Sequence, residues 1–366
     1  MVLAGVGLAV AGLFALESPT PPRSDGPGTP AGSDADATAQ AAARRFLERY
    51  VAADGRVRRI DQGDDTVSEG QAYGLLLAAA VGDQARFDAV QDWTARNLRR
   101  PDGLFASRWR DGRVGDPQAA ADAEVDYARA LLVGACSFDR SELRGQAEGL
   151  GRAVLAEETA APGGRPVLVA GPWARGEAAT INPSYFAPAT FAALQRSSGD
   201  GRFGLLAASS RELVAELQEA GPLPPDWARL DARGRAQAIG TPSSPGAPIR
   251  YGFDAARTLV RLAEDPDPAG PRLAGAAWSV FRGKDRDEVA VVERELSGSP
   301  AGNDRHPVAL VGAAGAASAA GDGAAAARLL DAAEALDRRA PTYYGSAWVA
   351  LGRLMLTTDR LTVCSD

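Results

Sequence analysis

Glu69 is a carboxylate at the very start of an apolar helix, a position where an acid often has a chemical role. It lies in the stretch Thr-Val-Ser-Glu-Gly-Gln-Ala-Tyr-Gly-Leu, and the following residues are apolar on every face, which predicts a fully buried helix over 68–81. Ser68 and Gln71 have the spacing of a capping box, so we expect Ser68 to cap the helix and Gln71 to reach back. A first-turn acid also suits the helix dipole, and the spacing alone leaves both interpretations open.

Two further segments carry acids at predicted helix starts. Asp122, Glu124 and Asp126 open an Ala-rich helix, where helical geometry places Asp122 and Asp126 on one face and turns Glu124 elsewhere. Asp254 opens another helix, and taken alone it has the character of an ordinary helix cap. Taken together, two carboxyl groups on either side of a bond can act as general acid and general base.

The composition restricts the other chemistries. The 366 residues include one histidine and two cysteines, which argues against a zinc site of His and Cys ligands. No G-x-S-x-G turn accompanies His306, so we expect it at a helix entry or on the surface. The formal net charge of -7 argues against nucleic acid as a partner. We therefore expect acid–base chemistry on carboxylates, with no metal and no cofactor.

Four segments resemble one known family. Ser-Glu-Gly-Gln-Ala-Tyr-Gly at 68–74 resembles the segment that carries the catalytic acid in family 8 glycoside hydrolases. Residues 120–126 resemble the family's Ala-Ser/Thr-Asp-Ala/Gly-Asp signature, and residues 251–257 its Tyr-Asp-Ala-x-Arg stretch. Asn-Pro-Ser-Tyr at 182–185 is similar to a fourth family segment. The four occur in the family's order across most of the chain.

The matches also depart from the family pattern. Ala121 replaces the hydroxyl residue of the acidic signature, and Glu124 replaces its second aspartate. Phe253 stands where many members have Tyr. These departures leave Asp122 and Asp254 themselves intact.

The resemblance implies a role for each matching residue. Glu69 would be the general acid, Asp254 the general base, and Asp122 the carboxylate that holds the sugar at the cleavage site. Tyr185 would lie beside the catalytic water, and Arg257 would keep Asp254 ionised.

Sugar binding also needs aromatic faces. We expect Tyr73 and Tyr251, from the matching segments, to contact substrate, and Trp109, in an extended stretch, is the best candidate for a stacking platform. For Trp348, deep in the last predicted helix, we expect core packing. Further aromatic residues near predicted helix ends are Trp173, Tyr343 and Tyr344.

The pattern of apolar residues predicts an all-α fold. A buried helix over 68–81 followed by an amphipathic one over 83–98 is typical of an inner and outer pair. About twelve helices in such pairs fit an (α/α)6 barrel, with an irregular α-solenoid as the alternative. Extended excursions are expected at 102–116 and 162–183. The helices are expected at 39–53, 68–81, 83–98, 117–136, 140–158, 184–196, 203–217, 254–264, 270–281, 304–319, 323–337 and 343–357.

The N-terminal segment indicates export. Residues 2–16 form one uncharged apolar run, which predicts a signal peptide or a signal anchor within residues 1–17. Residues 18–37 are rich in Pro, Gly and Ser and predict a flexible linker. The catalytic domain is then expected over 38–366, as a secreted or membrane-anchored monomer. We expect Cys136 and Cys364 to be unrelated, although an exported protein permits their pairing.

The sequence thus predicts an inverting glycoside hydrolase that cuts internal β-1,4 bonds of a glucan. Two alternatives remain at this point. One is a family 8-like xylanase or chitosanase. The other is a catalytically impaired polysaccharide-binding or scaffold protein of a cell-envelope system, which the changes at Ala121 and Glu124 favour.

Overall fold

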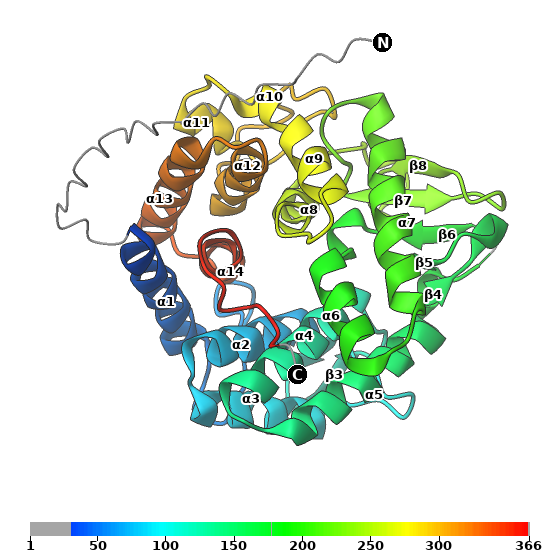
Figure 1. The fold of residues 1–366 in the computed structure, drawn as a ribbon, viewed down its shortest axis with the longest axis vertical. Helices are drawn as coiled ribbons and strands as arrows, with labels where there is room; N and C mark the ends of the chain where they lie inside the picture. The colour runs from blue at the N-terminus through cyan, green and yellow to red at the C-terminus, as the bar shows by residue number, and fades with distance from the viewer. Residues whose placement is uncertain (1–30, 177, 365–366) are drawn as a thin grey trace, which may run out of the picture.

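Six helices form a closed inner ring in the computed structural model, which describes residues 31–176 and 178–364. Each inner helix packs against the next, and the last returns to the first (Figure 1). The inner helices are α2 (Ser68–Val81), α4 (Ala121–Ser137), α6 (Pro188–Ser198), α8 (Phe253–Ala263), α12 (Pro307–Ala319) and α14 (Tyr343–Thr357).

Six outer helices cover this ring, so the predicted (α/α)6 barrel is confirmed. The outer helices are α1 (Ala31–Tyr50), α3 (Gln84–Asn97), α5 (Ser141–Glu157), α7 (Arg202–Leu217), α9 (Ala269–Ala276) and α13 (Gly323–Arg339). Two short helices, α10 (Trp278–Phe281) and α11 (Arg286–Val289), follow α9.

The ends of α2 show how the sequence defines one inner helix. It is buried along nearly its whole length and ends at Gly82, whose φ of 71° is the left-handed conformation that glycine adopts readily. Asp83 then caps α3 through the backbone N–H of Arg86. The predicted capping box is wrong: the cap position is Val67, and the Gln71 amide instead bonds to the backbone of the preceding loop and to outer helix α3.

In the described part of the chain, three small antiparallel sheets lie outside the helices. The excursion at 102–116 forms a hairpin beside β1, and the one at 162–183 contributes to the other two sheets. The hairpin β7–β8 lies in a segment for which the sequence predicts neither a helix nor an extended excursion. The sheets are β1 (Thr66–Val67), β2 (Arg108–Arg110) and β3 (Arg113–Asp116); β4 (Thr159–Ala160) and β5 (Val167–Leu168); and β6 (Ala179–Ile181), β7 (Trp227–Leu230) and β8 (Ala236–Ile239). The connections among the described residues also contain 3-10 turns: η1 (Pro162–Gly164), η2 (Pro172–Ala174), η3 (Pro183–Tyr185) and η4 (Gln218–Ala220).

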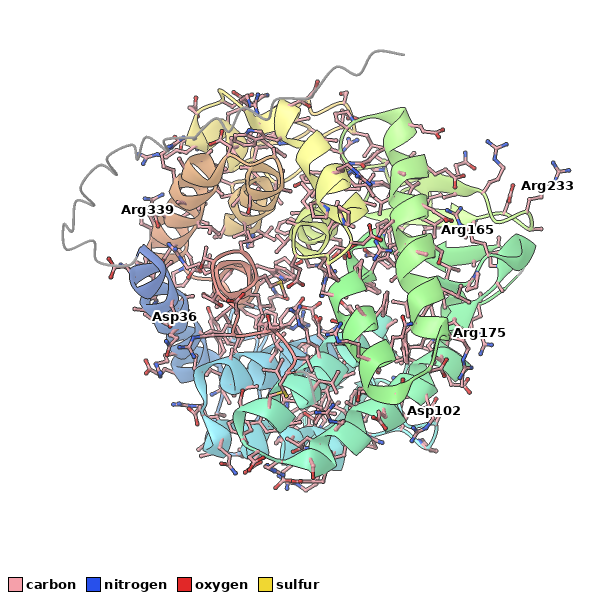
Figure 2. The ribbon with its side chains drawn as sticks, viewed as in Figure 1. Asp36, Asp102, Arg165, Arg175, Arg233 and Arg339 are labelled. Carbon is pink, nitrogen blue, oxygen red and sulfur yellow. A yellow bond between two sulfur atoms is a disulfide. The ribbon has the colours of Figure 1, made fainter. Side chains whose placement is uncertain are left out.

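The first helix begins earlier than predicted. α1 starts at Ala31, so the last part of the expected linker is helical, and Asp36 there forms an ion pair with Arg360. Figure 2 shows charged side chains such as Asp36 and Arg233 on the periphery of the ring. The predicted signal segment lies outside the described residues. Among the helices that are described, none has the length and apolar character needed to cross a bilayer.

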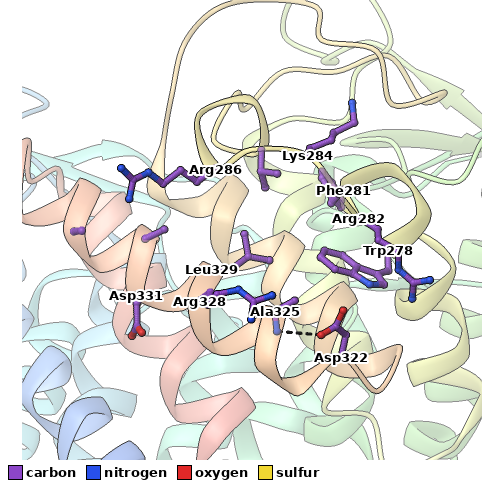
Figure 3. Close-up of a pocket in the computed structure, with 14 residues that line it drawn as sticks. Trp278, Phe281, Arg282, Lys284, Arg286, Asp322, Ala325, Arg328, Leu329 and Asp331 are labelled. Carbon is purple, nitrogen blue, oxygen red and sulfur yellow. Dashed lines mark hydrogen bonds between the residues drawn. The ribbon is translucent and has the colours of Figure 1, made fainter.

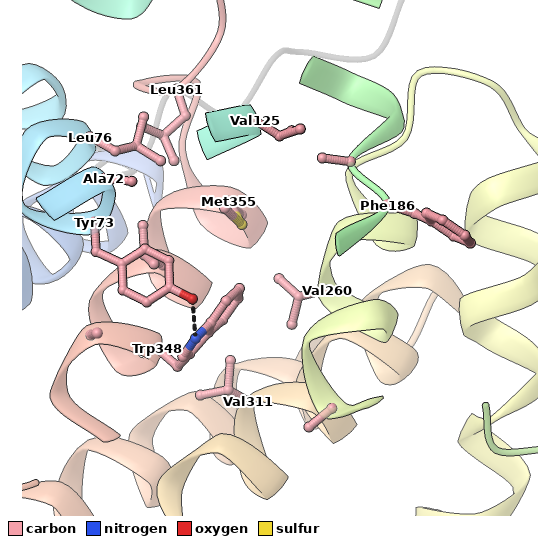
Figure 4. Close-up of a cluster of buried hydrophobic side chains, with 14 of the residues drawn as sticks. Ala72, Tyr73, Leu76, Val125, Phe186, Val260, Val311, Trp348, Met355 and Leu361 are labelled. Atoms are coloured by element: carbon pink, nitrogen blue, oxygen red, sulfur yellow. Dashed lines mark hydrogen bonds between the residues drawn. The ribbon is translucent and has the colours of Figure 1, made fainter. Parts of the chain in front are cut away.

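A disulfide and a hydrogen bond also connect elements that are distant in the sequence. Cys136, at the end of α4, forms a disulfide with Cys364, so the expectation that they are unrelated is wrong. Trp348 of α14 is fully buried, as predicted, and its indole N–H donates to the hydroxyl of Tyr73 at 3.2 Å (Figure 4).

His306 lies at the entry of helix α12, as predicted. It caps this helix by accepting the backbone N–H of Val308.

Candidate active site

The first turns of three inner helices converge at one end of the ring. Glu69 lies in the first turn of α2, Asp122 in that of α4, and Asp254 in that of α8. Side chains of a helix tilt toward its N-terminus, so all three carboxyl groups point past the helix ends. The residues that sequence reasoning selected from distant segments are therefore brought together.

Arg257 is the group that connects them. Its Nη1 donates to Asp122 Oδ2 at 3.0 Å and to the hydroxyl of Tyr73 at 3.1 Å, and its Nη2 donates to Asp254 Oδ1 at 2.7 Å. Nη1 also lies 3.8 Å from Glu69 Oε2. The guanidinium is 1% exposed, so these are charge-assisted contacts in a poorly solvated place.

The surroundings of Glu69 favour its protonated form. Burial, and after it the negative charge of Asp122, raises the pKa of Glu69 to about 7, although Arg257 opposes the shift. The hydroxyl of Tyr343 lies 3.4 Å from Glu69 Oε1. With 23% of its side chain exposed, Glu69 can still meet a ligand from solvent. A carboxyl group with this proton affinity suits a general acid near neutral pH.

Asp122 and Asp254 have different surroundings. Asp122 is almost fully buried, and burial raises its pKa to about 6 in spite of Arg257. Asp254 has 29% of its side chain exposed and accepts a second bond, from Asn182 Nδ2, at 2.9 Å. Ser184 donates to Asn182 Oδ1 and so turns the amide nitrogen toward Asp254. The two donors hold this solvent-accessible carboxylate in one orientation, as a general base requires.

The chain is similar to known proteins in sequence and in structure. Residues 31–269 match the family described as Glycosyl hydrolases family 8. The chain belongs to this family. An endoglucanase of Xanthomonas axonopodis pv. citri is 32% identical over 200 residues, which are 51% of this chain and 52% of that protein. A probable endoglucanase of Novacetimonas hansenii is 30% identical over 236 residues, which are 62% of this chain and 68% of the relative. The first match thus spans about half of the relative's length.

A solved structure extends the likeness over the whole ring. The endo-beta-1,4-glucanase CMCax from Acetobacter xylinum is 26% identical, with a TM-score of 0.73, and the match covers 88% of this chain and 98% of that one. A beta-1,3-1,4-glucanase from Paenibacillus sp. X4 has a TM-score of 0.79 at 17% identity, which shows the shared fold alone.

In this family 8 protein, aromatic rings lead outward from the carboxylates. The ring centre of Tyr185 lies 5.5 Å from the guanidinium of Arg257, and the Trp227 ring lies 6.2 Å beyond Tyr185. Trp173 follows at 6.5 Å from Trp227 and is 45% exposed. The three rings thus form a row that runs from the carboxylates to the protein surface.

Two of the residues predicted to contact sugar pack against other side chains. Tyr251 is fully buried against Phe281, so its predicted contact with substrate is wrong. Trp109, on β2, is partly buried: it forms a T-shaped pair with Trp93 at 5.4 Å between ring centres, and the guanidinium of Arg56 lies 4.6 Å from the centre of its ring. Its role as a stacking platform stays a prediction.

Tyr73 is also fully buried. Its hydroxyl accepts hydrogen bonds from both Arg257 and Trp348, so Tyr73 holds the guanidinium in place and does not contact a sugar itself. The predicted substrate contact therefore becomes a support for the arginine.

The altered signature on α4 leaves the site contacts in place. Glu124 points away from Asp122, as predicted, and its Oε1 accepts the backbone N–H of Phe105 at 2.8 Å. Burial raises the pKa of Glu124 to about 8. Glu158 is buried too, and burial, and after it the charge of Glu124, raises the pKa of Glu158 well above its usual value. Asp126 pairs with Arg261, which lies one turn after Arg257 on α8.

The described residues contain no group of three or more His, Cys, Asp or Glu side chains that could hold a metal ion. A cavity of about 800 Å³ lies between α10, α11 and α13 (Figure 3). It is lined by Trp278, Arg282, Arg286, Asp322 and Arg328 among others, and none of the three site carboxylates belongs to it.

Sequence reasoning missed three residues around Asp254. Asn182 lies in a quoted motif but received no role. Trp227 and Asp226 lie between two helices, in a segment that showed no periodic pattern. The Pro-Pro-Asp-Trp run at 224–227 is a turn signal that could have marked this place.

Proposed function

We propose that this family 8 protein is an inverting endo-β-1,4-glucanase, with Glu69 as general acid and Asp254 as general base. The observation that carries the proposal is the position of Arg257, which bonds to Asp254 and Asp122 and lies against Glu69. The endoglucanase relatives support the same activity.

Inversion requires a water between the base and the sugar, with carboxyl groups roughly 6.5–9.5 Å apart. Here two different nitrogens of Arg257 approach the two carboxyls, at 3.8 Å from Glu69 and 2.7 Å from Asp254, which favours the wider arrangement over the direct attack that retention needs. Asp254 removes a proton from the water as its oxygen bonds to the anomeric carbon. Glu69 delivers its proton to the leaving glycosidic oxygen as that bond breaks.

The neighbouring groups have supporting roles in this reaction. Asp122, fixed by Arg257, is placed to hold the sugar hydroxyls at the cleavage site and to keep Glu69 protonated by its charge. The ring of Tyr185 lies against the guanidinium of Arg257, which holds Asp254, so its hydroxyl can orient the water.

The stereochemistry of the product tests the proposal. We expect the first product from a β-linked cello-oligosaccharide to be the α-anomer, as seen by proton NMR within minutes of mixing. A β-anomer would mean that Asp254 is not the base. Glucan binding without the release of reducing ends would favour the impaired binding protein instead.

The preferred polymer needs its own experiment. A panel of carboxymethyl cellulose, mixed-linkage glucan, xylan and chitosan, assayed for reducing ends, should show the highest kcat/KM on a β-1,4-glucan. A clear preference for xylan or chitosan would show that glucan is not the preferred substrate. It would leave the acid–base assignment unchanged.

We also propose that the protein is exported and acts as a monomer. The apolar run at 2–16 supports export, as does the disulfide between Cys136 and Cys364, because disulfides persist mainly in oxidising compartments. Cell fractionation that finds the protein only in the cytosol would contradict export, and light scattering would give the oligomeric state.

A further inference from the structure

Helix α8 carries Asp254 but has no capping side chain of its own. Its N-cap residue is Gly252, which has no side chain to accept the free N–H groups of the first turn. Asp226, which lies before β7, supplies the acceptor. Its Oδ1 accepts the N–H of Gly252 at 3.0 Å and that of Ala255 at 2.7 Å. The cap is therefore provided from a segment 26 residues upstream.

The backbone fixes Asp226 in this position. Its own N–H donates to the carbonyl of Arg250 at 2.8 Å, so three hydrogen bonds tie it to the entry of α8. A Cβ on Gly252 would lie 2.5 Å from Asp226 Oδ2, closer than atoms can approach. Gly252 is thus needed for the close approach of the carboxyl group.

This arrangement leaves the side chain of Asp254 available. An aspartate at a helix start commonly caps the helix itself. Here Asp226 satisfies the backbone, and the Asp254 carboxyl bonds instead to Arg257 and Asn182.

The three-stranded sheet brings Asn182 and Asp226, the two residues that contact α8, close together. β6 pairs antiparallel with β7, with Ile181 opposite Ala228, so Asn182 and the residues preceding β7 lie at the same end of the sheet. Asn182 holds the carboxyl of Asp254, and Asp226 holds the helix that carries it. The next residue, Trp227, packs on Tyr185.

We propose that Asp226 is a positioning residue for the general base: by capping α8 from the sheet, it fixes the direction of the Asp254 carboxyl toward the attacking water. This inference rests on the proposed role of Asp254. Burial and the charge of Asp254 raise the pKa of Asp226 to about 7, so an amide, which has the same acceptor oxygen, should be a close substitute.

The test compares Asp226→Ala and Asp226→Asn on soluble β-1,4-glucan. A displacement of about 1 Å can cost on the order of 100-fold in rate, so we expect kcat of Asp226→Ala to fall by about that factor while KM changes less than threefold. Asp226→Asn should recover kcat to within about fivefold of the wild type, because it keeps the acceptor oxygen.

Asp231→Ala is the matched control. Asp231 is exposed, lies in the turn between β7 and β8 and accepts the backbone N–H groups of Arg233 and Arg235, so its loss should leave kcat unchanged. Hydrogen–deuterium exchange of residues 252–256 gives a readout independent of activity, and it should become faster in Asp226→Ala only. If Asp226→Ala fails to fold, Gly252→Ala takes its place in the test. The added Cβ displaces the Asp226 carboxyl, so kcat should fall.

The outcomes separate the two proposals. Faster exchange with kcat within threefold of wild type would overturn the positioning role, as would an Asp226→Asn variant no better than Asp226→Ala. A wild-type protein that releases no product from any β-linked polymer would instead refute the proposed function.

Discussion

The two halves of the reaction centre are built in different ways. We call Glu69 and Asp122, with α2 and α4, the acid side, and Asp254, Asn182 and Asp226, with α8, β6 and β7, the base side. The acid side comes from two inner helices that pack directly on each other. The base side needs a helix start and two strand ends that meet only in the folded sheet.

The carboxyl groups of the two sides also have different surroundings. On the acid side, burial comes first among the causes that raise the pKa of Glu69, with the Asp122 charge second. On the base side, the Asp254 carboxyl accepts two direct hydrogen bonds and stays open to solvent. The acid should therefore respond mainly to changes in neighbouring charge and polarity, and the base mainly to changes in geometry.

The largest effect should separate the acid from the base. Glu69→Gln and Asp254→Asn should each lower kcat on glucan by about 10³-fold, within the usual range for loss of a general acid or base. On an aryl cellobioside with a dinitrophenol leaving group, which departs without a proton, Glu69→Gln should regain most of its activity and Asp254→Asn should not. Equal recovery of both variants would contradict the division into two sides.

A medium effect should appear in the pH profile. The general acid must be protonated, so kcat/KM should fall as the pH rises through the pKa of Glu69, about 7. Asp122→Asn removes a negative neighbour that favours the protonated form, so the alkaline limb should move down by about one pH unit. Asp116→Asn, on exposed β3, is the control. An unmoved limb would show that Asp122 does not tune the acid.

The smallest effect concerns stability. Burial raises the pKa of Glu124 from 4.5 to about 8, and one of its oxygens lacks a partner. The folded state therefore binds this proton more tightly than the unfolded state, and the stability it contributes is complete below about pH 4.5 and is lost as the pH rises toward 8.

Glu124→Gln removes this titration. Its melting temperature should exceed that of the wild type at pH 8 by about 2 °C or more, and the difference should shrink or reverse at pH 5. Differential scanning calorimetry at both pH values checks this. A constant difference between them would mean that Glu124 does not titrate in this range.

Sequence patterns predicted the parts whose cause is local. Apolar residues on every face of α2 gave both its bounds and its place in the inner ring, and Asp83 was recognised as the start of α3. The capping box failed because it assumed a local partner, whereas the Gln71 amide bonds to Val57 and Thr94.

The base side was harder to predict for the same reason. Asp226 caps α8 by accepting backbone N–H groups that lie 26 and 29 residues away in the sequence, and no periodic pattern predicts such contacts. The strands β7 and β8 are only four residues each, too short to show a clear alternation. Tyr251 was misassigned because an aromatic residue near a motif has the same appearance in sequence whether its ring is open or covered.

The disulfide between Cys136 and Cys364 has a consequence for proteolysis. It joins the end of the second inner helix to the tail after the last one, so most of the ring lies inside one covalent loop of the chain. A protease that cuts the backbone once between these cysteines yields two pieces that sulfur still holds together. Such nicked protein should migrate as a single band on a denaturing gel without reductant and as two bands with it.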